Sequence, residues 1–167
     1  HVRQLIIGSG FAGIGTAIKL AESGRTDFAV IEKGPRVGGT WRDNTYPGAA
    51  CDVPSQLYSF SFALNPNWSR SFSPQPEIQA YLERVAKASG TLDRFWFDTT
   101  VEEAAWDEDA GHWNVTTTAG SITADVLISG SGGLSAPKLP DIEGIGDFAG
   151  AIFHTARWNH DVDLTGR

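Results

Sequence analysis

The apolar residues near the N-terminus follow two different periodicities. Residues 4–7 and 28–31 are short apolar runs that contain β-branched residues, which is typical of strands buried on both faces. Between them, the apolar positions of residues 14–21 recur at helical spacing, and the pattern ends at Gly24. A strand, a helix and a second strand within about 30 residues predict a βαβ unit.

The middle of the chain lacks such periodicity. Residues 33–72 are rich in Gly, Pro, Asn, Ser and aromatic side chains, and the aromatic content argues against disorder. Loops of this length are usually functional, so we expect a ligand to lie across this stretch. A second helix is expected from residue 74 to Gly90, because two prolines suit its start and apolar residues then recur at helical spacing.

Several short strands separated by turns are expected in the second half of the chain. They lie at residues 95–97, 101–106, 112–118, 121–123 and 126–128. The last of them ends in the glycine-rich stretch 129–133, after which spaced prolines and glycines indicate irregular structure. The whole pattern predicts an α/β, Rossmann-like fold with a small β-meander.

Composition narrows the classes of function. A net charge of -7 and a pI near 4.9 argue against a nucleic-acid partner, which favours a basic surface. No apolar run approaches the roughly 18 residues of a membrane span, and the start does not resemble a signal peptide, so a cytoplasmic location is expected. The single cysteine, Cys51, excludes an internal disulfide and a CxxC metal or redox site, and no metal site is expected. Because the chain starts with His1 and contains no methionine, we expect it to be a segment of a longer protein.

A G-x-G-x-x-G motif at Gly8, Gly10 and Gly13 lies between the first strand and its helix. The first glycine permits a sharp turn, the second lets the backbone approach a pyrophosphate, and the third lets helix and strand pack closely. Glu32 follows about 20 residues later, where an acid can accept hydrogen bonds from ribose hydroxyls. The alternative is a glycine-rich turn of another α/β protein, with Glu32 merely solvated.

The next segment distinguishes FAD from NAD. Gly38 and Gly39 resemble the second FAD signature of two-dinucleotide-binding flavoproteins, in which the flavin end of the cofactor runs along this loop. In the disulfide reductases of that superfamily a redox dithiol follows the glycine pair. Trp41 stands in the place of the first cysteine here, so that chemistry is excluded. The same loop argues against an NAD-dependent dehydrogenase.

Two longer stretches make the resemblance specific. Residues 39–52 read G-T-W-R-D-N-T-Y-P-G-A-A-C-D and resemble the G-T-W…Y-P-G…C-D stretch of Baeyer–Villiger monooxygenases, the class B flavin monooxygenases. Residues 53–62 continue the likeness. Phe148, Gly150, His154 and Trp158 match the family signature F-x-G-x-x-x-H-x-x-x-W, so the resemblance covers nearly the whole chain.

The resemblance implies an NADPH- and O2-dependent oxygenation. In such enzymes NADPH reduces FAD, and a C4a-peroxyflavin then attacks a ketone to give an ester or lactone, while related enzymes oxidise sulfur or nitrogen. It also implies a Rossmann-like FAD-binding domain at residues 1–135 and a linker at residues 136–167 that leads to an NADPH-binding domain missing from this sequence. Alone, the segment is expected not to turn over NADPH.

The family's residue roles carry over by position. Thr40, Trp41 and Asp43 would lie along the flavin, Tyr58 beside its ring, and Val101 against the adenine through its backbone. Asp52, the expected catalytic residue, would face the flavin near the nicotinamide and pair with an arginine of the second domain. The complete expected cofactor-binding set is Gly8, Ser9, Gly10, Phe11, Ala12, Gly13, Glu32, Lys33, Gly39, Thr40, Trp41, Asp43, Ala50, Cys51, Asp52, Tyr58 and Val101.

Other interpretations stay open at this point. Asp52 could cap a turn before Pro54, and Cys51 could be only a packed thiol. His154 and Trp158 would sit where the two dinucleotide domains join, although His154 could instead be a core histidine. At the level of the whole protein, the rivals are an N- or S-oxygenating flavin monooxygenase and a truncated flavin-binding module without catalysis.

Overall fold

A mixed sheet of six strands, in the order β3-β2-β1-β6-β5-β4, is the centre of the computed structural model, which describes residues 1–166. The strands are β1 (Val2–Ile7), β2 (Phe28–Ile31), β3 (Phe95–Trp96), β4 (Val101–Asp107), β5 (His112–Thr117) and β6 (Gly120–Ser129). β1 pairs in parallel with β2 and β6, and β2 pairs in parallel with β3, whereas β4, β5 and β6 form an antiparallel meander. The predicted α/β class with a small meander is confirmed.

β6 is one continuous strand, where the sequence pattern predicts two short strands at 121–123 and 126–128. Its first half pairs with β5 and its second half with β1, and Ala124 is the residue that both neighbours share. Ala124 is fully buried whereas Val126 is 47% exposed. The burial of alternate residues therefore ends where the strand changes its partners, and the apolar run 126–128 looks like a separate strand.

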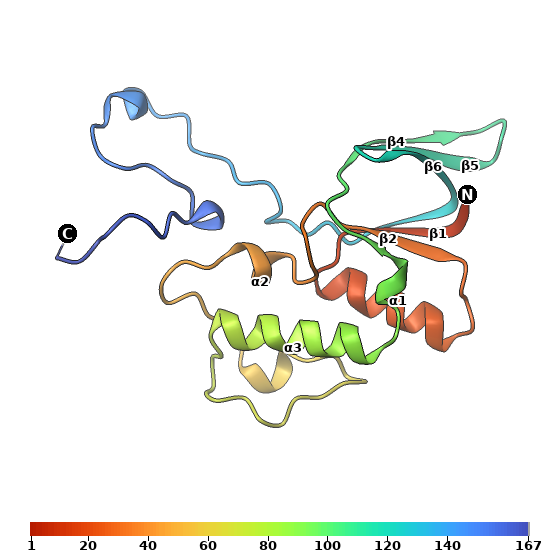
Figure 1. Ribbon diagram of the computed structural model, residues 1–167, viewed down its shortest axis with the longest axis horizontal. Helices are drawn as coiled ribbons and strands as arrows, with labels where there is room; N and C mark the ends of the chain where they lie inside the picture. The colour runs from red at the N-terminus through yellow and green to blue at the C-terminus, as the bar shows by residue number, and fades with distance from the viewer. Residues whose placement is uncertain (167) are drawn as a thin grey trace.

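Two long helices cover one face of the sheet (Figure 1). α1 (Phe11–Glu22) and α3 (Gln75–Ala88) confirm the two predicted helices. Their apolar positions, including Ile14, Ile18, Tyr81 and Leu82, form one buried core with residues of β1 and β2. In the described part of the chain, no helix has both the length and the apolar character that crossing a bilayer requires.

The meander covers the opposite face of the parallel strands (Figure 1). A second core joins Leu5 of β1 and Ile31 of β2 to Val115 and Ile122 of the meander. The parallel strands are thus buried on both faces, which is why residues 28–31 are apolar without interruption.

The segments outside the sheet and the two long helices are mostly irregular. The stretch from residue 32 to 74 contains the single-turn helix α2 (Thr40–Asp43) and the 3-10 turn η1 (Ser55–Leu57). It packs against α3, where Tyr81 accepts a hydrogen bond from the Phe60 amide at 2.7 Å. After β6, residues 130–166 contain 3-10 turns η3 (Ile145–Asp147) and η4 (Thr155–Arg157), and the segment runs away from the sheet (Figure 1). The 3-10 turn η2 (Leu92–Arg94) leads into β3.

Candidate functional site

The carboxyl ends of β1, β2 and β6 meet at one edge of the sheet. Ile7 pairs with Ile31 on one side and with Ser129 on the other. Ligands of open parallel sheets bind at this edge, where adjacent connections leave a crevice. A cavity of about 740 Å³ opens there, within the range of about 300–1,000 Å³ that is usual for small-molecule sites.

Most of the residues expected to bind a cofactor line this cavity. They are Gly8, Ser9, Gly10, Phe11, Ala12, Glu32, Lys33, Gly39, Thr40, Trp41, Asp43, Tyr58 and Val101. Gly38 of the second FAD signature also lines it, whereas sequence reasoning missed the rest of the wall, namely Ile7, Ile31, Arg42, Thr99, Thr100, Ser129, Gly130, Ser131, Gly132, Leu134 and Ser135. Several of these follow β6 or precede β4, so only the strand order brings them to the site.

The glycines of the first turn hold it close to neighbouring backbone. Gly8 has a φ of +94°, and a Cβ there would lie 2.6 Å from the carbonyl oxygen of Gly130. A Cβ on Gly13 would lie 1.8 Å from the carbonyl oxygen of Gly8, so Gly13 serves the packing of α1 against the turn and does not line the cavity. Around Gly10 the nearest atom to a Cβ is the Cα of Gly39, at 3.8 Å. Gly10 and Gly39 thus leave a bare backbone wall, beside the start of a helix whose first amide groups lack intrahelical partners.

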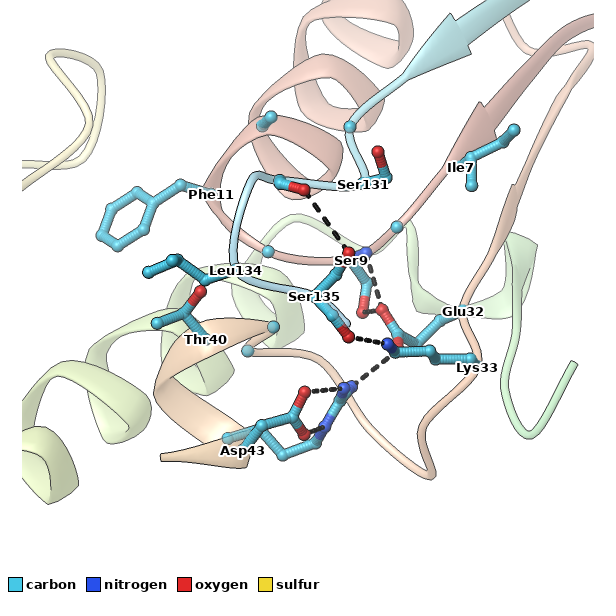
Figure 2. A pocket seen from close by; sticks show the side chains of 18 of the residues that line it. Ile7, Ser9, Phe11, Glu32, Lys33, Thr40, Asp43, Ser131, Leu134 and Ser135 are labelled. Atoms are coloured by element: carbon cyan, nitrogen blue, oxygen red, sulfur yellow. Dashed lines mark hydrogen bonds and ion pairs between the residues drawn. The ribbon is translucent and has the colours of Figure 1, made fainter. Parts of the chain in front are cut away.

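Glu32 lies at the end of β2 and is only 3% exposed. One carboxylate oxygen accepts hydrogen bonds from the amide and hydroxyl groups of Ser9, at 2.8 and 2.7 Å. The other accepts the Gly34 amide at 2.7 Å and forms an ion pair with Arg42 at 2.8 Å. Figure 2 shows Ser9 turned toward Glu32 among the side chains that line the cavity. That Glu32 binds a ribose stays a prediction.

Arg42 is a buried cation that sequence reasoning missed. Besides Glu32, its guanidinium binds both carboxylate oxygens of Asp43, at 2.7 and 3.0 Å, and donates to the carbonyl oxygen of Arg36 at 2.6 Å. Burial lowers the pKa of Arg42, but the hydrogen bond to Asp43 and the two carboxylate charges outweigh it and raise the pKa overall. No periodicity relates Arg42 to Glu32, so only the path of the loop between them reveals the pair.

Three aromatic rings line the part of the cavity near α2. The indole nitrogen of Trp41 donates to the hydroxyl of Tyr58 at 3.2 Å, and the two rings meet edge to face. Phe11 packs edge to face on Tyr58 from the other side, with ring centroids 5.2 Å apart. Burial raises the pKa of Tyr58, although its hydrogen bond with Trp41 acts in the opposite direction. Tyr58 therefore remains a neutral phenol at pH 7.

Two buried glutamines of α3 hold the glycine-pair loop from behind. The side-chain amide of Gln75 donates to the carbonyl oxygen of Trp41, and that of Gln79 donates to the carbonyl oxygen of Val37 at 2.9 Å. The Gly38 amide in turn donates to the carbonyl oxygen of Ser9 at 2.9 Å. The loop is thus fixed between α3 and the first glycine turn.

The opposite end of the cavity is bounded by segments on either side of the meander. Thr99, Thr100 and Val101 line it, and Lys33 reaches across to donate a hydrogen bond to the carbonyl oxygen of Ser135 (Figure 2). This bond joins the end of β2 to the glycine-rich segment that follows β6.

Ala50, Cys51 and Asp52 lie outside the cavity wall, although all three were expected to contact the cofactor. Cys51 is buried, and its thiol lies 3.8 Å from the hydroxyl of Ser55, which fits a packed thiol. Asp52 is exposed. The residue before it is anchored, because the Cys51 amide donates to the carbonyl oxygen of Ser73 at 3.0 Å.

The short turn η4, which lies between His154 and Trp158 of the C-terminal signature, packs against α2. The imidazole of His154 accepts a hydrogen bond from the Ala156 amide at 3.0 Å and so caps η4, and it is partly exposed, not a core histidine. Trp158 packs on Phe153, and its ring centroid lies 6.4 Å from that of Tyr46. The signature thus contacts the loop that follows α2.

Comparisons with known proteins agree with this geometry. Residues 6–85 match the family described as an NAD(P)-binding Rossmann-like domain. A Baeyer–Villiger monooxygenase of Streptomyces coelicolor is 55% identical over 167 residues, which are 100% of this chain and 32% of that protein. One of Pseudomonas aeruginosa is 46% identical over 168 residues, again covering 100% of this chain and 32% of that protein.

Solved structures give the same result. OTEMO in complex with FAD and NADP has a TM-score of 0.87 at 37% identity, covering 96% of this chain and 31% of that one. Cyclohexanone monooxygenase bound to ε-caprolactone has a TM-score of 0.89 at 36% identity, covering 98% of this chain and 33% of that one. The chain thus spans only about a third of the length of these relatives. Because the likeness in sequence and in fold extends over nearly all of its residues, the chain belongs to the Baeyer–Villiger monooxygenase family, in which it corresponds to the N-terminal third.

Proposed function

We propose that this chain binds FAD as the N-terminal part of an NADPH- and O2-dependent flavin monooxygenase that oxygenates ketones or sulfides. The observation that carries the proposal is the bare backbone wall of Gly10 and Gly39, with Glu32 beside it, at the carboxyl edge of the sheet. Its relatives support the same cofactor pair, since OTEMO is solved with FAD and NADP.

Each part of the cavity suits one part of the cofactor. The first glycine turn and the start of α1 would hold the diphosphate, because helix N-termini favour anions. Glu32 would face the adenosine ribose, with Lys33 and Val101 at the adenine end. Thr40, Trp41, Asp43 and Tyr58 would line the flavin end. When bound, FAD supplies hydride acceptance from NADPH and the activation of dioxygen.

The aromatic rings at the flavin end would keep water away from the reaction. Tyr58 meets both Phe11 and Trp41 through ring edges, so the three rings form a continuous, mostly apolar wall. A reaction that consumes dioxygen without releasing peroxide needs such exclusion of water. The hydroxyl of Tyr58 keeps its proton and stays oriented by Trp41, so it offers a neutral donor at a fixed place.

Asp52 is proposed as the catalytic residue near the nicotinamide. It is exposed and lies outside the cavity wall, which leaves it accessible to a second dinucleotide-binding domain of a longer protein. Residues 136–167 are proposed as the linker to that domain, and residues 1–135 as the FAD-binding domain. Trp158 contacts Tyr46, so the proposed linker lies beside the loop that follows α2.

Flavin binding and oxygenation are tested separately. The chain is mixed with FAD and gel-filtered, and absorbance near 450 nm with flavin fluorescence released on denaturation is the expected result. A chain that elutes colourless at saturating FAD would refute flavin binding by this segment. NADPH consumption by the chain alone is expected to stay at background. The longer parent, given ketone, sulfide and amine substrates, is expected to form esters, lactones or sulfoxides, and products oxidised only at nitrogen would contradict the proposed substrate class.

A further inference from the structure

The carboxylate of Glu32 is oriented by the chain before any ligand arrives. It has about four acceptor positions. The amide and hydroxyl of Ser9, the amide of Gly34 and the guanidinium of Arg42 together supply four donors to it. A ribose hydroxyl that binds Glu32 therefore meets a carboxylate whose direction is already set.

Arg42 is the one charged group among these donors, and its place is built into the fold. Its side chain is 7% exposed, and a Cβ on Gly34 would lie 2.3 Å from the Cζ atom of Arg42. Residue 34 thus leaves the space that the guanidinium fills. The planar fork reaches Glu32, Asp43 and the Arg36 carbonyl together, a geometry that a lysine cannot reproduce.

Arg42 also balances the charge of the cavity wall. The charged residues that line the cavity are Glu32, Lys33, Arg42 and Asp43, two of each sign. Lys33 is exposed, so Arg42 is the buried cation between the two carboxylates. Without Arg42, only the exposed Lys33 would offset the two carboxylates. The negative charges of these carboxylates would then repel an incoming diphosphate.

We propose that Arg42 is a positioning residue of the cofactor site, which acts through Glu32. It fixes the Glu32 carboxylate for the adenosine ribose and joins that acid to α2 at the flavin end. The inference rests on the proposed binding of FAD. Arg42 itself stays paired with Glu32 and Asp43 and is not expected to contact the cofactor.

A double-mutant cycle in the full chain tests this coupling. The variants are Arg42→Met, Glu32→Gln and their combination, with FAD affinity measured by the quenching of flavin fluorescence. Arg42→Met is expected to weaken FAD binding by about tenfold or more, because it leaves a buried carboxylate unpaired. In the Glu32→Gln background the same change is expected to weaken binding by less than about threefold, because no carboxylate remains to be oriented.

Arg36→Met is the matched control. Arg36 belongs to the same loop and pairs with Glu83 at 3.3 Å, but its side chain is 60% exposed. Arg36→Met is expected to leave FAD affinity unchanged, since exposed ion pairs contribute little to stability. Arg42→Lys keeps the charge without the fork and is expected to fall between Arg42→Met and the unchanged chain. The melting temperature of each flavin-free variant, followed by circular dichroism, shows whether it folds. If Arg42→Met does not fold, Arg42→Lys replaces it in the double-mutant cycle.

The outcomes separate the two proposals. If the unchanged chain fails to bind FAD, the proposed function fails and the inference with it. If the chain binds FAD but Arg42→Met binds equally well or more tightly, only the inference fails. The inference alone also fails if Arg42→Met weakens FAD binding by the same factor in the unchanged chain and in the Glu32→Gln background. ADP as a competitor locates the effect: an Arg42→Met chain that binds ADP normally but FAD weakly would show action through the flavin end, against the proposal.

Discussion

A Cβ on Gly39 would come within 3.1 Å of the Cα of Gly10, so the two glycine motifs of this chain form one surface. One motif follows β1 and the other precedes α2. A side chain at position 39 would press on the backbone at Gly10, whereas one at position 10 would fit without a close contact but would fill the space beside Gly39. The site therefore depends on the absence of side chains at Gly10 and Gly39.

Substitutions of Gly10 and Gly13 should separate binding from folding. Gly10→Ala, and more strongly Gly10→Val, is expected to lower FAD affinity with little loss of stability, because a Cβ there has no neighbour closer than 3.8 Å. Gly13→Ala is expected to destabilise the chain by about 1–3 kcal/mol or more, because its Cβ would overlap the backbone at Gly8. Urea unfolding and FAD titration of each variant make the comparison. Normal flavin content in Gly10→Val would show that the diphosphate lies elsewhere.

Ser9→Ala tests whether the Ser9 hydroxyl competes with the ribose for Glu32. The hydroxyl donates to Glu32 at 2.7 Å, and it is the neutral donor that can rotate away. We expect Ser9→Ala to bind FAD as tightly as the unchanged chain, or a few-fold more tightly, while the flavin-free chain loses about 1 kcal/mol of stability. Calorimetric titration with FAD measures the first effect and urea unfolding the second. Binding ten times weaker would mean that the hydroxyl contacts the cofactor directly.

Gln79→Glu should loosen the glycine-pair loop. A carboxylate cannot donate to the carbonyl oxygen of Val37, and it would also face Glu83, which now accepts a hydrogen bond from Gln79 at 2.7 Å. We expect a loss of about 1–3 kcal/mol of stability, typical of a buried group left unsatisfied, together with weaker FAD binding. Gln56→Glu is the matched control, since Gln56 is exposed. Faster amide hydrogen exchange in residues 37–41 of Gln79→Glu, and not of Gln56→Glu, would locate the effect.

The raised pKa of Tyr58 predicts a loss of stability in alkaline solution. Burial keeps the phenol protonated in the folded chain at pH values where the unfolded chain already ionises, so the folded state binds more protons. Stability should therefore fall as the pH rises above about 10, the ordinary pKa of tyrosine. Burial also raises the pKa of Tyr81, so Tyr58→Phe is expected to reduce this alkaline loss without abolishing it. Urea unfolding between pH 8 and 11 measures both slopes, and equal slopes would contradict the assignment to Tyr58.

The sequence pattern predicted those parts of the fold in which neighbours along the chain are neighbours in space. The βαβ unit and α3 follow from apolar periodicity, and the first glycine turn follows from its position between a strand and a helix. β6 was mistaken for two strands because its two halves pair with different strands, so buried and exposed residues do not alternate regularly along its whole length.

The missed parts of the site depend on contacts between distant segments. Arg42 reaches Glu32 only because the loop between them folds back, and Gln79 reaches Val37 from a helix that begins more than thirty residues later. Ala50, Cys51 and Asp52 lie outside the cavity wall, and their expected contact with the cofactor stays a prediction. Buried polar pairs such as Arg42 with Glu32 and Gln79 with Val37 follow no periodic pattern along the chain, so only the structure reveals them.

The double pairing of β6 links the hairpin that precedes it to the nucleotide cavity. Gly130 follows β6 directly, and its amide donates to the carbonyl oxygen of Ile7 at 2.8 Å. Because side chains alternate along a strand, a slip of one residue between β5 and β6 would reverse every side chain of β6 and shift Gly130 along the edge. A register slip that begins at the turn near Ala119 would therefore reach the cavity, because β6 is one continuous strand from Gly120 to Ser129.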